Sequence, residues 1–421
     1  MTTEIRPATL ARPKAPQSTL PYDAEHPQLA LLSNSQYGVI ITAAGAGVST
    51  WRGLDVTRWR EDVTRDCWGQ FCYVRDLSED KTWSVGHQPL CRAADEYEVK
   101  FHPRKAEFRR LDGDIETRWA VCVMPDADSE VRAMTIVNHG NRPRELELTS
   151  YAEVCLSNRR GDQAHPAFGK LFLETQFDKP TGALLARRRP RGAEEKPVWV
   201  VHVSSANEAA SGAIDYETDR VRFLGRGRTA ANPAAMDPRA FLSKTTGPVL
   251  DPVFSLRRRV HLRPGETACV AFITGAADTR EEALAIAEPF QDFGAADRAF
   301  SAALVESQKE NQELSLTPDD VALFNRLATA VLFTDSKLRQ LDAIAANRLG
   351  QSGLWPHAIS GDLPIVLVRV AGVADESLVR ELIKWHAYVR RRGLESDLVI
   401  LDERDDDSSN RLKDELQASA S

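Results

Sequence analysis

The sequence lacks the patterns that mark several common classes of protein. No stretch approaches the ~18 consecutive apolar residues of a membrane-spanning helix, and the first residues lack the apolar core of a signal peptide. The net charge is −7, so no cationic excess is available for nucleic acid, and the short arginine runs are scattered. We therefore expect a cytoplasmic protein with no membrane span in this chain and no nucleic-acid partner.

Metal-binding patterns are also missing. The six cysteines form no Cys-x-x-Cys pair, and His-Glu-x-x-His does not occur. The cysteines fall in or beside apolar runs that resemble strands, at Cys67, Cys72, Cys91, Cys122, Cys155 and Cys269. We expect reduced, mostly buried thiols, no structural metal and no bound cofactor.

The glycine fingerprint of dinucleotide-binding proteins is incomplete. Gly45 and Gly47 form a Gly-x-Gly, but Thr50 occupies the position of the third glycine. An Arg- and Trp-rich segment follows instead of an apolar helix, which argues against a dinucleotide site.

What the chain does contain is a long series of strand patterns. Its 421 residues, 42% of them apolar, suffice for two domains with a substantial core. From residue 31 to residue 275, runs with period-two alternation are separated by turns such as Asp112-Gly113 and Pro264-Gly265. A break in the alternation after Leu148 suggests a bulge, and a short strand is expected at Val221–Leu224 within an irregular excursion from 205 to 252. The pattern predicts a large antiparallel sandwich.

Residues 1–30, rich in Pro, Thr and Ala, are expected to form a flexible tail.

After residue 275 the apolar period becomes helical. Helices are expected at 280–287, at 295–313, and after Thr317, which with Pro318 forms a helix start. Residues 276–330 are therefore predicted to be a helical linker. Beyond it, a helix at 375–392 lies between two short apolar runs, so strand-helix-strand is one interpretation of residues 331–421.

The segment from Trp51 to Trp68 has the composition of a binding surface. Tryptophans alternate with arginines and carboxylates, and indole faces together with charged forks suit the C–H faces and hydroxyls of sugars. Ordinary ion-pair networks at strand ends use the same residue types, so a structural role is the alternative. The candidate ligands in this segment are Arg58, Trp59, Arg60, Glu61, Asp62, Arg65 and Asp66.

The run Trp-Arg-x-Leu-Asp-Val-Thr-Arg-Trp-Arg-Glu-Asp, from Trp51 to Asp62, resembles the N-terminal domain of the glycosyltransferase-36 group, also called glycoside hydrolase family 94. This group contains inverting disaccharide phosphorylases and the C-terminal region of cyclic β-1,2-glucan synthases, and the synthase branch is the nearer match. Two further segments agree, around His165-Pro166-Ala167-Phe168 and from Leu354-Trp355-Pro356 to Asp362-Leu363-Pro364.

The resemblance implies a super-β-sandwich of two sheets, a helical linker and the start of an (α/α)₆ barrel carrying a strand-like insertion. It adds His165, Trp355 and Asp362 to the candidate substrate-binding residues. In the family, a carboxylic acid protonates the glycosidic oxygen while inorganic phosphate, the co-substrate, attacks from the opposite face. The acid lies further along the barrel than this sequence extends, so the catalytic residue is unknown here.

Three functional hypotheses follow. In the first, the chain is the N-terminal part of an enzyme acting on β-glucan oligosaccharides, either a gene fragment or one half of a split enzyme, and its expected partner is a second copy in a homodimer or a separately encoded barrel half. Alternatively it is a stand-alone, non-catalytic carbohydrate-binding module. The third hypothesis is an aldose-epimerase-like enzyme, for which His139 and His165 are the candidates.

Overall fold

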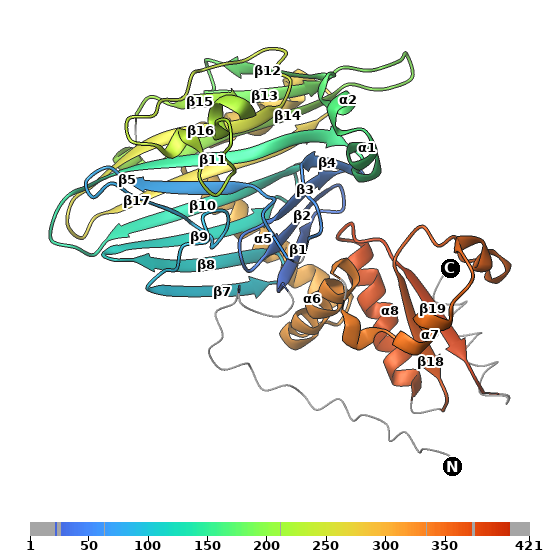
Figure 1. Cartoon of the computed structure of the whole chain (residues 1–421). Coiled ribbons are helices and arrows are strands. Elements are labelled where there is room, and N and C mark those ends of the chain that lie inside the picture. The colour runs from blue at the N-terminus through green and yellow to red at the C-terminus, as the bar shows by residue number, and fades with distance from the viewer. Residues whose placement is uncertain are drawn as a thin grey trace.

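Two large antiparallel sheets form the first part of the chain, and helices follow them (Figure 1). The computed structural model describes residues 22, 27–62, 64–210, 212–333, 335–372 and 375–404. The nine-stranded sheet contains β1 (Leu29–Ser33), β2 (Tyr37–Thr42), β3 (Gly47–Trp51), β4 (Leu54–Thr57), β11 (Arg144–Ser157), β16 (Pro252–Leu262) and β15 (Asp215–Asp219), with β5 (Phe71–Asp76) and β6 (Lys81–Ser84) branching from β11. The eight-stranded sheet contains β12 (Leu173–Asp178), β13 (Ala183–Arg188), β14 (Val198–Ala206), β17 (Thr267–Ala277), β10 (Ser129–Asn138), β9 (Ile115–Val123), β8 (Lys105–Asp112) and β7 (Glu96–His102). The predicted sandwich is confirmed.

The hairpin of β8 and β9 shows how the sequence produces these strands. Ala106, Phe108 and Arg110 alternate with less buried residues along β8. Asp112 pairs with Ile115, so the connection is a two-residue turn, and Gly113 takes a φ of +59° there. A left-handed conformation is strained for residues with a Cβ, which explains why glycine suits this turn.

The main core lies between the two sheets. Tyr37 and Trp51 from the first sheet share one buried cluster with Phe108 and Trp119 from the second. Each large aromatic side chain removed from water contributes about 1.5–3 kcal/mol before the entropy of ordering is subtracted.

The predicted bulge after Leu148 is wrong. Pairing of β11 with β5 and β16 keeps one register through this position, and the irregularity lies between Val154 and Ser157, opposite β4. The alternation fails at Leu148 for another reason, which is that nearly every residue of β11 is buried. A strand covered on both faces has no solvent side to keep polar.

The predicted strand at Val221–Leu224 is also wrong, because this run belongs to helix α3 (Arg220–Leu224). The Asp219 side chain accepts a hydrogen bond from Val221 N and so caps the helix start. Short apolar runs do not distinguish a strand from a helical turn. The sequence analysis also missed α1 (Arg159–Ala164) and α2 (Pro166–Lys170).

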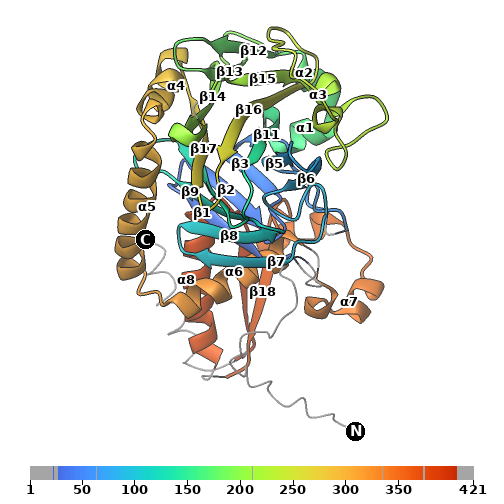
Figure 2. The same ribbon diagram turned by 90° about the vertical axis from the view of Figure 1, so that its left-hand side faces the viewer.

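Two helices cover the outer face of the eight-stranded sheet, α4 (Arg280–Ala287) and α5 (Gly294–Glu313) (Figure 2). Both lie where the sequence predicts them. Thr279 forms a capping box with Glu282, and the apolar side of the helices packs on Val201, Val203 and Ile273.

The remaining residues build a smaller region beside β1. Its elements are α6 (Pro318–Leu332), α7 (Leu341–Ala346), β18 (Ile365–Val370), α8 (Glu376–Arg390) and β19 (Asp397–Asp402). Short 3₁₀ helices occur at Glu208–Ala210, Ala234–Met236, Glu288–Gln291, Ser336–Leu338, Gln351–Gly353 and Trp355–His357. β18 and β19 pair in parallel, which is the strand-helix-strand interpretation.

The predicted tail lies outside the described residues except for residues 22 and 27–30, and β1 already begins at Leu29. The end of the last predicted region, 405–421, also lies outside them.

The smaller region shares a core with the sandwich. Leu29 and Leu31 of β1 lie in one buried cluster with Phe324 of α6 and with Trp385 and Tyr388 of α8. Figure 1 shows both helices against this end of the sheet.

A buried polar network crosses the sandwich. Glu130 has no exposed surface, and its carboxylate accepts hydrogen bonds from Tyr37 Oη at 2.9 Å, Gln70 Nε2 at 2.5 Å and Arg132 Nε at 2.7 Å. Because a buried carboxylate is costly without partners, these donors are needed for the fold.

His202 lies at the other end of this network. Its Nε2 is 2.9 Å from Ser150 Oγ, its Nδ1 is 2.9 Å from Thr274 Oγ1, and its ring lies between Phe254 and Phe272. Burial, with the charge of Arg132, lowers the pKa of His202 to about 3.

We expect His202 to make the protein less stable in mild acid. The unfolded chain binds a proton near pH 6.5 and the folded chain does not, so stability is full above that pH and falls as the pH drops toward 3. The loss between pH 7 and pH 5 is roughly 2 kcal/mol. In urea unfolding across this range, His202→Asn should lose this dependence, whereas Ser150→Ala, which removes a hydrogen bond but keeps the imidazole, should retain it. Equal slopes in all three proteins would contradict the assignment.

Candidate functional site

The charged segment from Arg58 to Asp66 follows β4 at the edge where α1 and α2 lie. Arg58 N donates to Glu153 O of β11 at 2.9 Å, which joins the start of the segment to the sheet. Asn158 caps α1 and Pro166 begins α2, so the chain after β11 turns back over the segment.

Arg58 is the centre of a buried ionic cluster. Its Nη1 donates to Glu153 Oε2 at 2.9 Å, its Nε lies 3.3 Å from Asp162 Oδ2, and Asp251 is 3.6 Å away. Arg60 adds a second ion pair to Asp162. Arg58 is 5% exposed and Asp162 is 3% exposed, so these charges are shielded from water.

Further cations complete the cluster around the same carboxylates. Arg220 Nε donates to Glu153 Oε1 at 2.6 Å, and Lys170 Nζ lies 2.7 Å from Asp251. Burial alone would raise the pKa of Glu153, but Arg220 and Arg58 outweigh it and hold that pKa below its usual value. For Asp162, burial is likewise outweighed by Arg58 and Arg60, and its pKa is also lowered. Carboxylates held ionised in this way are poor proton donors near neutral pH.

Trp59 is not available to a sugar in this structure. Its side chain is 1% exposed, it packs edge-on against Phe333 at 6.2 Å between ring centroids, and the Arg159 guanidinium lies 4.9 Å from its ring centre. It belongs to the cluster that joins β1 to the helices. Trp59 is therefore a core residue, which removes the stacking platform that the composition suggested.

The next candidates lie at the surface. Glu61 and Arg65 are exposed, and Asp62 accepts from Thr64 N at 3.0 Å and from its hydroxyl at 2.6 Å. The Thr64 hydroxyl is the main reason that the pKa of Asp62 is lowered. Asp62 thus caps its own turn, an ordinary role for this residue type.

Asp66 differs from its neighbours because its carboxylate is poorly paired. Oδ2 accepts from Thr42 Oγ1 at 2.8 Å, but Oδ1 has neither solvent contact nor a hydrogen-bond partner among the described residues. Burial raises the pKa of Asp66 to about 6. A carboxyl that titrates near neutrality is a recognised mark of functional sites, so Asp66 remains the strongest candidate within the segment.

Of the three more distant candidates, the structure links one to the cluster. Asp362 O accepts from Arg160 Nη2 at 2.8 Å, and its carboxylate lies 3.7 Å from Arg160 Nη1, so α1 contacts the 351–362 loop. His165 is an exposed residue between α1 and α2. Trp355 is 63% exposed and is the one tryptophan with a freely accessible ring in the described chain.

The two histidines of the epimerase hypothesis do not share a site. His139 follows β10 and His165 follows β11, beyond opposite ends of the 14-residue strand β11. A strand of this length spans roughly 45 Å. His139 instead lies 3.7 Å from Glu116.

The carboxylates that organise this edge, Glu153, Asp162 and Asp251, were not among the candidates that the sequence indicated. Glu153 offered a signal, since a charged residue among Ala152, Val154 and Cys155 in an apolar run implies a buried ionic partner. The identity of that partner was not readable, because Arg58 lies 95 residues away in the chain.

No group of three metal-ligating side chains that could hold an ion occurs in the part of the chain that the structure describes. Among the same residues, no helix is both long and apolar enough to cross a membrane.

The family model and the curated relatives in sequence point to one family. The model for the supersandwich domain of glycosyl hydrolase 94 matches residues 18–293. Cyclic beta-(1,2)-glucan synthase NdvB of Rhizobium meliloti (strain 1021) is 34% identical over 398 residues, which is 94% of this chain and 14% of that protein. N,N'-diacetylchitobiose phosphorylase of Vibrio proteolyticus is 24% identical over 66% of this chain and 34% of its own length. A bacterial glucoamylase structure aligns with a TM-score of 0.42 at 9% identity over 74% of this chain and 42% of its own.

The chain thus spans 14% of the synthase and 34% of the phosphorylase. The match to the synthase covers 94% of the chain and so continues beyond residue 293, where the family match ends. The helices and the parallel strand pair are therefore part of the similarity.

Proposed function

The chain belongs to the glycosyl hydrolase 94 family, and from this membership we propose that it supplies the sandwich and the first elements of the next domain for an enzyme that acts on β-linked glucans. The reaction is glycosyl transfer or phosphorolysis with inorganic phosphate as co-substrate. The catalytic acid lies outside this chain. The same proposal places the protein in the cytoplasm and divides the second part of the chain into a helical linker, 276–330, and the start of a barrel, 331–421.

The observation that carries the proposal is the exposed apolar surface of the smaller region. Side chains that are each more than half exposed are Leu338, Leu341, Ile344, Leu349, Trp355 and Leu367. Leu338, Leu367 and Leu378 line one groove of about 350 Å³. Exposed apolar surface of this kind marks an interaction site, and the remaining part of a helical barrel is the partner that the family membership suggests.

The chemistry of the described residues also supports placing the catalytic acid in a partner rather than in this chain. An inverting mechanism needs a protonated carboxylic acid beside the glycosidic oxygen. Glu153 and Asp162 are held ionised and are enclosed by arginines, so they fit a supporting role at the edge of a neighbouring active site. A separately encoded barrel half would supply the acid and complete the site, whereas a homodimer, the other assembly we propose, would cover the same exposed apolar surface.

We expect the purified chain, incubated with phosphate and β-1,2-linked gluco-oligosaccharides, to release no glucose 1-phosphate above a protein-free blank. The reason is that the proposal places the catalytic acid in the partner barrel half, while the buried carboxylates of the cluster, Glu153 and Asp162, are held ionised. An enzymatic assay for glucose 1-phosphate measures it, with a thermal melt of the same sample to show that the protein is folded. Robust turnover that Asp362→Asn or Glu61→Gln abolishes would place the acid in this chain and contradict the proposal.

The two alternative hypotheses predict different results in the same samples. A stand-alone binding module would hold oligosaccharides but would gain nothing from a barrel partner. An epimerase-like enzyme would speed the interconversion of glucose anomers without phosphate.

A further inference from the structure

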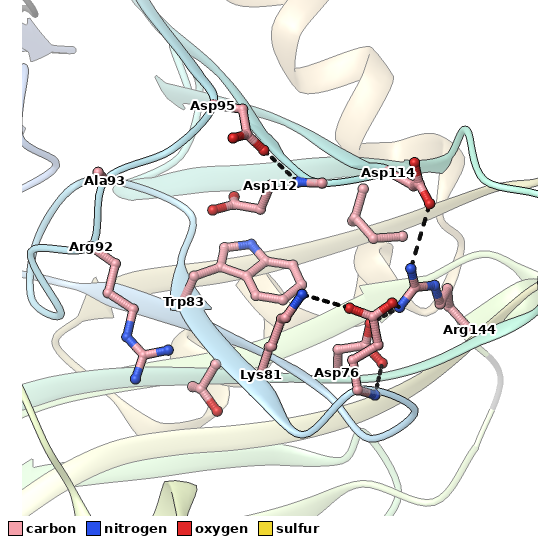
Figure 3. Close-up of a pocket in the computed structure, with 13 residues that line it drawn as sticks. Asp76, Lys81, Trp83, Arg92, Ala93, Asp95, Asp112, Asp114 and Arg144 are labelled. Atoms are coloured by element: carbon pink, nitrogen blue, oxygen red, sulfur yellow. Dashed lines mark hydrogen bonds and ion pairs between the residues drawn. The ribbon is translucent and has the colours of Figure 1, made fainter.

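A second pocket lies at the opposite end of the sandwich from the Arg58 cluster. Figure 3 shows this pocket in close-up. It has a volume of about 440 Å³, within the range of small-molecule sites. Arg144 lines it at the start of β11, whereas Glu153 of the cluster lies nine residues further along the strand, roughly 30 Å away. The pocket is therefore separate from the candidate site described above.

Segments distant in the sequence meet at this pocket. The β5–β6 hairpin provides Asp76 and Trp83, the following loop provides Arg92 and Asp95, and the turn after β8 provides further lining residues. In Figure 3 these side chains surround the indole of Trp83, whose nitrogen lies on the side of Asp112. The walls thus rest on strands of both sheets, which makes the pocket a preformed feature of the sandwich.

Most charges in the pocket are already neutralised within the protein. Arg144 is buried, donates to Asp76 Oδ2 at 2.8 Å, contacts Glu79 and lies 3.6 Å from Asp114. The fully buried Arg110 holds both oxygens of Asp112, at 2.7 and 2.8 Å. These carboxylates are fixed in place and keep lone pairs free to accept hydrogen bonds from hydroxyl groups.

The same pairing argues against an ionic ligand. The carboxylates are spread among arginines, and no three metal-ligating side chains among the described residues converge on one point. An anion would meet Asp76, Asp95, Asp112 and Asp114 around the rim. An uncharged molecule with many hydroxyls avoids both problems.

Two groups in the pocket lack partners. Trp83 is 5% exposed, and its Nε1 has no hydrogen-bond acceptor in the described structure. Arg92 is exposed and its guanidinium makes neither an ion pair nor a side-chain hydrogen bond with any described residue. A buried indole N–H without an acceptor is unfavourable, and a ligand oxygen reaching it after a small side-chain shift would satisfy it.

We propose that the pocket formed by Trp83, Arg92, Asp95, Asp112 and Arg144 binds a short segment of an uncharged saccharide. Sugar hydroxyls are recognised by aromatic rings, hydrogen-bond donors and carboxylate acceptors. The pocket offers all three: an indole with an unpartnered N–H, one free guanidinium and a set of fixed carboxylates. The choice of a glucan as ligand rests on the proposed function. The pocket itself does not, because it lies far from the surface on which the catalytic partner is expected.

Isothermal titration with linear β-1,2-gluco-oligosaccharides tests this inference on the full chain. The wild type should bind, and Arg92→Ala should weaken binding about tenfold, the effect of losing one charged hydrogen-bond donor. Trp83→Phe, which keeps a ring but removes the N–H, should weaken it about three- to tenfold. Arg259→Ala, at an exposed arginine of β16 that does not line the pocket, is the matched control and should bind as the wild type does.

Each other outcome overturns the proposal. These outcomes are no binding at millimolar saccharide, binding that Arg92→Ala leaves unchanged, or competition of the saccharide by inorganic phosphate at this site. Since Arg92 is at the surface, its variant remains informative even if Trp83→Phe lowers the melting temperature. The glucose 1-phosphate assay is independent of this titration. Turnover by the chain would contradict the proposed function but would not affect the proposal for this pocket.

Discussion

Replacing Trp59 by alanine is expected to lower the free energy of unfolding by about 3–5 kcal/mol, the usual cost of deleting a buried indole. The side chain is 1% exposed and contacts Phe333 and the Arg159 guanidinium, so its removal leaves a cavity between the sandwich and the helices. Denaturant unfolding at neutral pH measures the loss, and any change in saccharide binding should simply follow the fraction unfolded.

Trp355→Ala provides the matched control for this experiment. Its ring is 63% exposed, so the same substitution should change the unfolding free energy by less than about 0.5 kcal/mol. A Trp59→Ala protein that melts like the wild type but binds saccharide about tenfold more weakly would show that the indole reaches ligand after all.

Arg58→Met is the second substitution with a large expected effect, about 3 kcal/mol of lost stability at pH 7. Methionine keeps much of the side-chain volume, so the loss of stability measures the effect of removing the positive charge. Without Arg58 the carboxylates of Glu153 and Asp162 remain buried with fewer cations, and removing one partner of a buried ionic group typically costs about 3–5 kcal/mol. We place the value at the lower end because Arg220 and Arg60 remain.

The pH dependence of this difference has a definite sign. The folded-state pKa values of Glu153 and Asp162 are lowered, so their stabilisation is present above the unfolded pKa of about 4 and is lost as the pH falls below it. The gap between wild type and Arg58→Met should therefore be largest near neutrality and should narrow below about pH 4. Arg259→Met, at a 65% exposed arginine, should cost less than about 1 kcal/mol at any pH. A gap that widens in acid would be incompatible with the cluster.

The sequence predicted the sandwich well because alternation is a local signal. β8 is half-buried, and its polar and apolar residues alternate visibly. β1 begins inside the segment expected to be a tail, and its five residues are all buried, so no alternation marks it in the sequence. The helices of α4 and α6 were found from their caps, Thr279 and Thr317.

The candidate site was predicted only in part, and the reason is long-range contact. The sequence showed that 58–66 is rich in charged residues, but it could not show that Arg58 is enclosed by Glu153 and Asp162. It also could not show that Trp59 points into a core built with α6 and α8, more than 250 residues later. Residue types specify what a segment is able to bind, whereas the fold decides which of those groups stay accessible.

The core shared by β1, α6 and α8 joins the sandwich and the smaller region into one folding unit. The family match ends at residue 293, yet Trp385 and Tyr388 fill the same cluster as Leu29 and Leu31. Glu310 of α5 also accepts hydrogen bonds from Nη1 and Nη2 of Arg392, each at 2.7 Å, and forms an ion pair with Arg104 at 3.2 Å. Opening either side exposes apolar surface of the other, so the two regions are energetically coupled and the unit of cooperativity extends well past the evolutionary boundary of the domain.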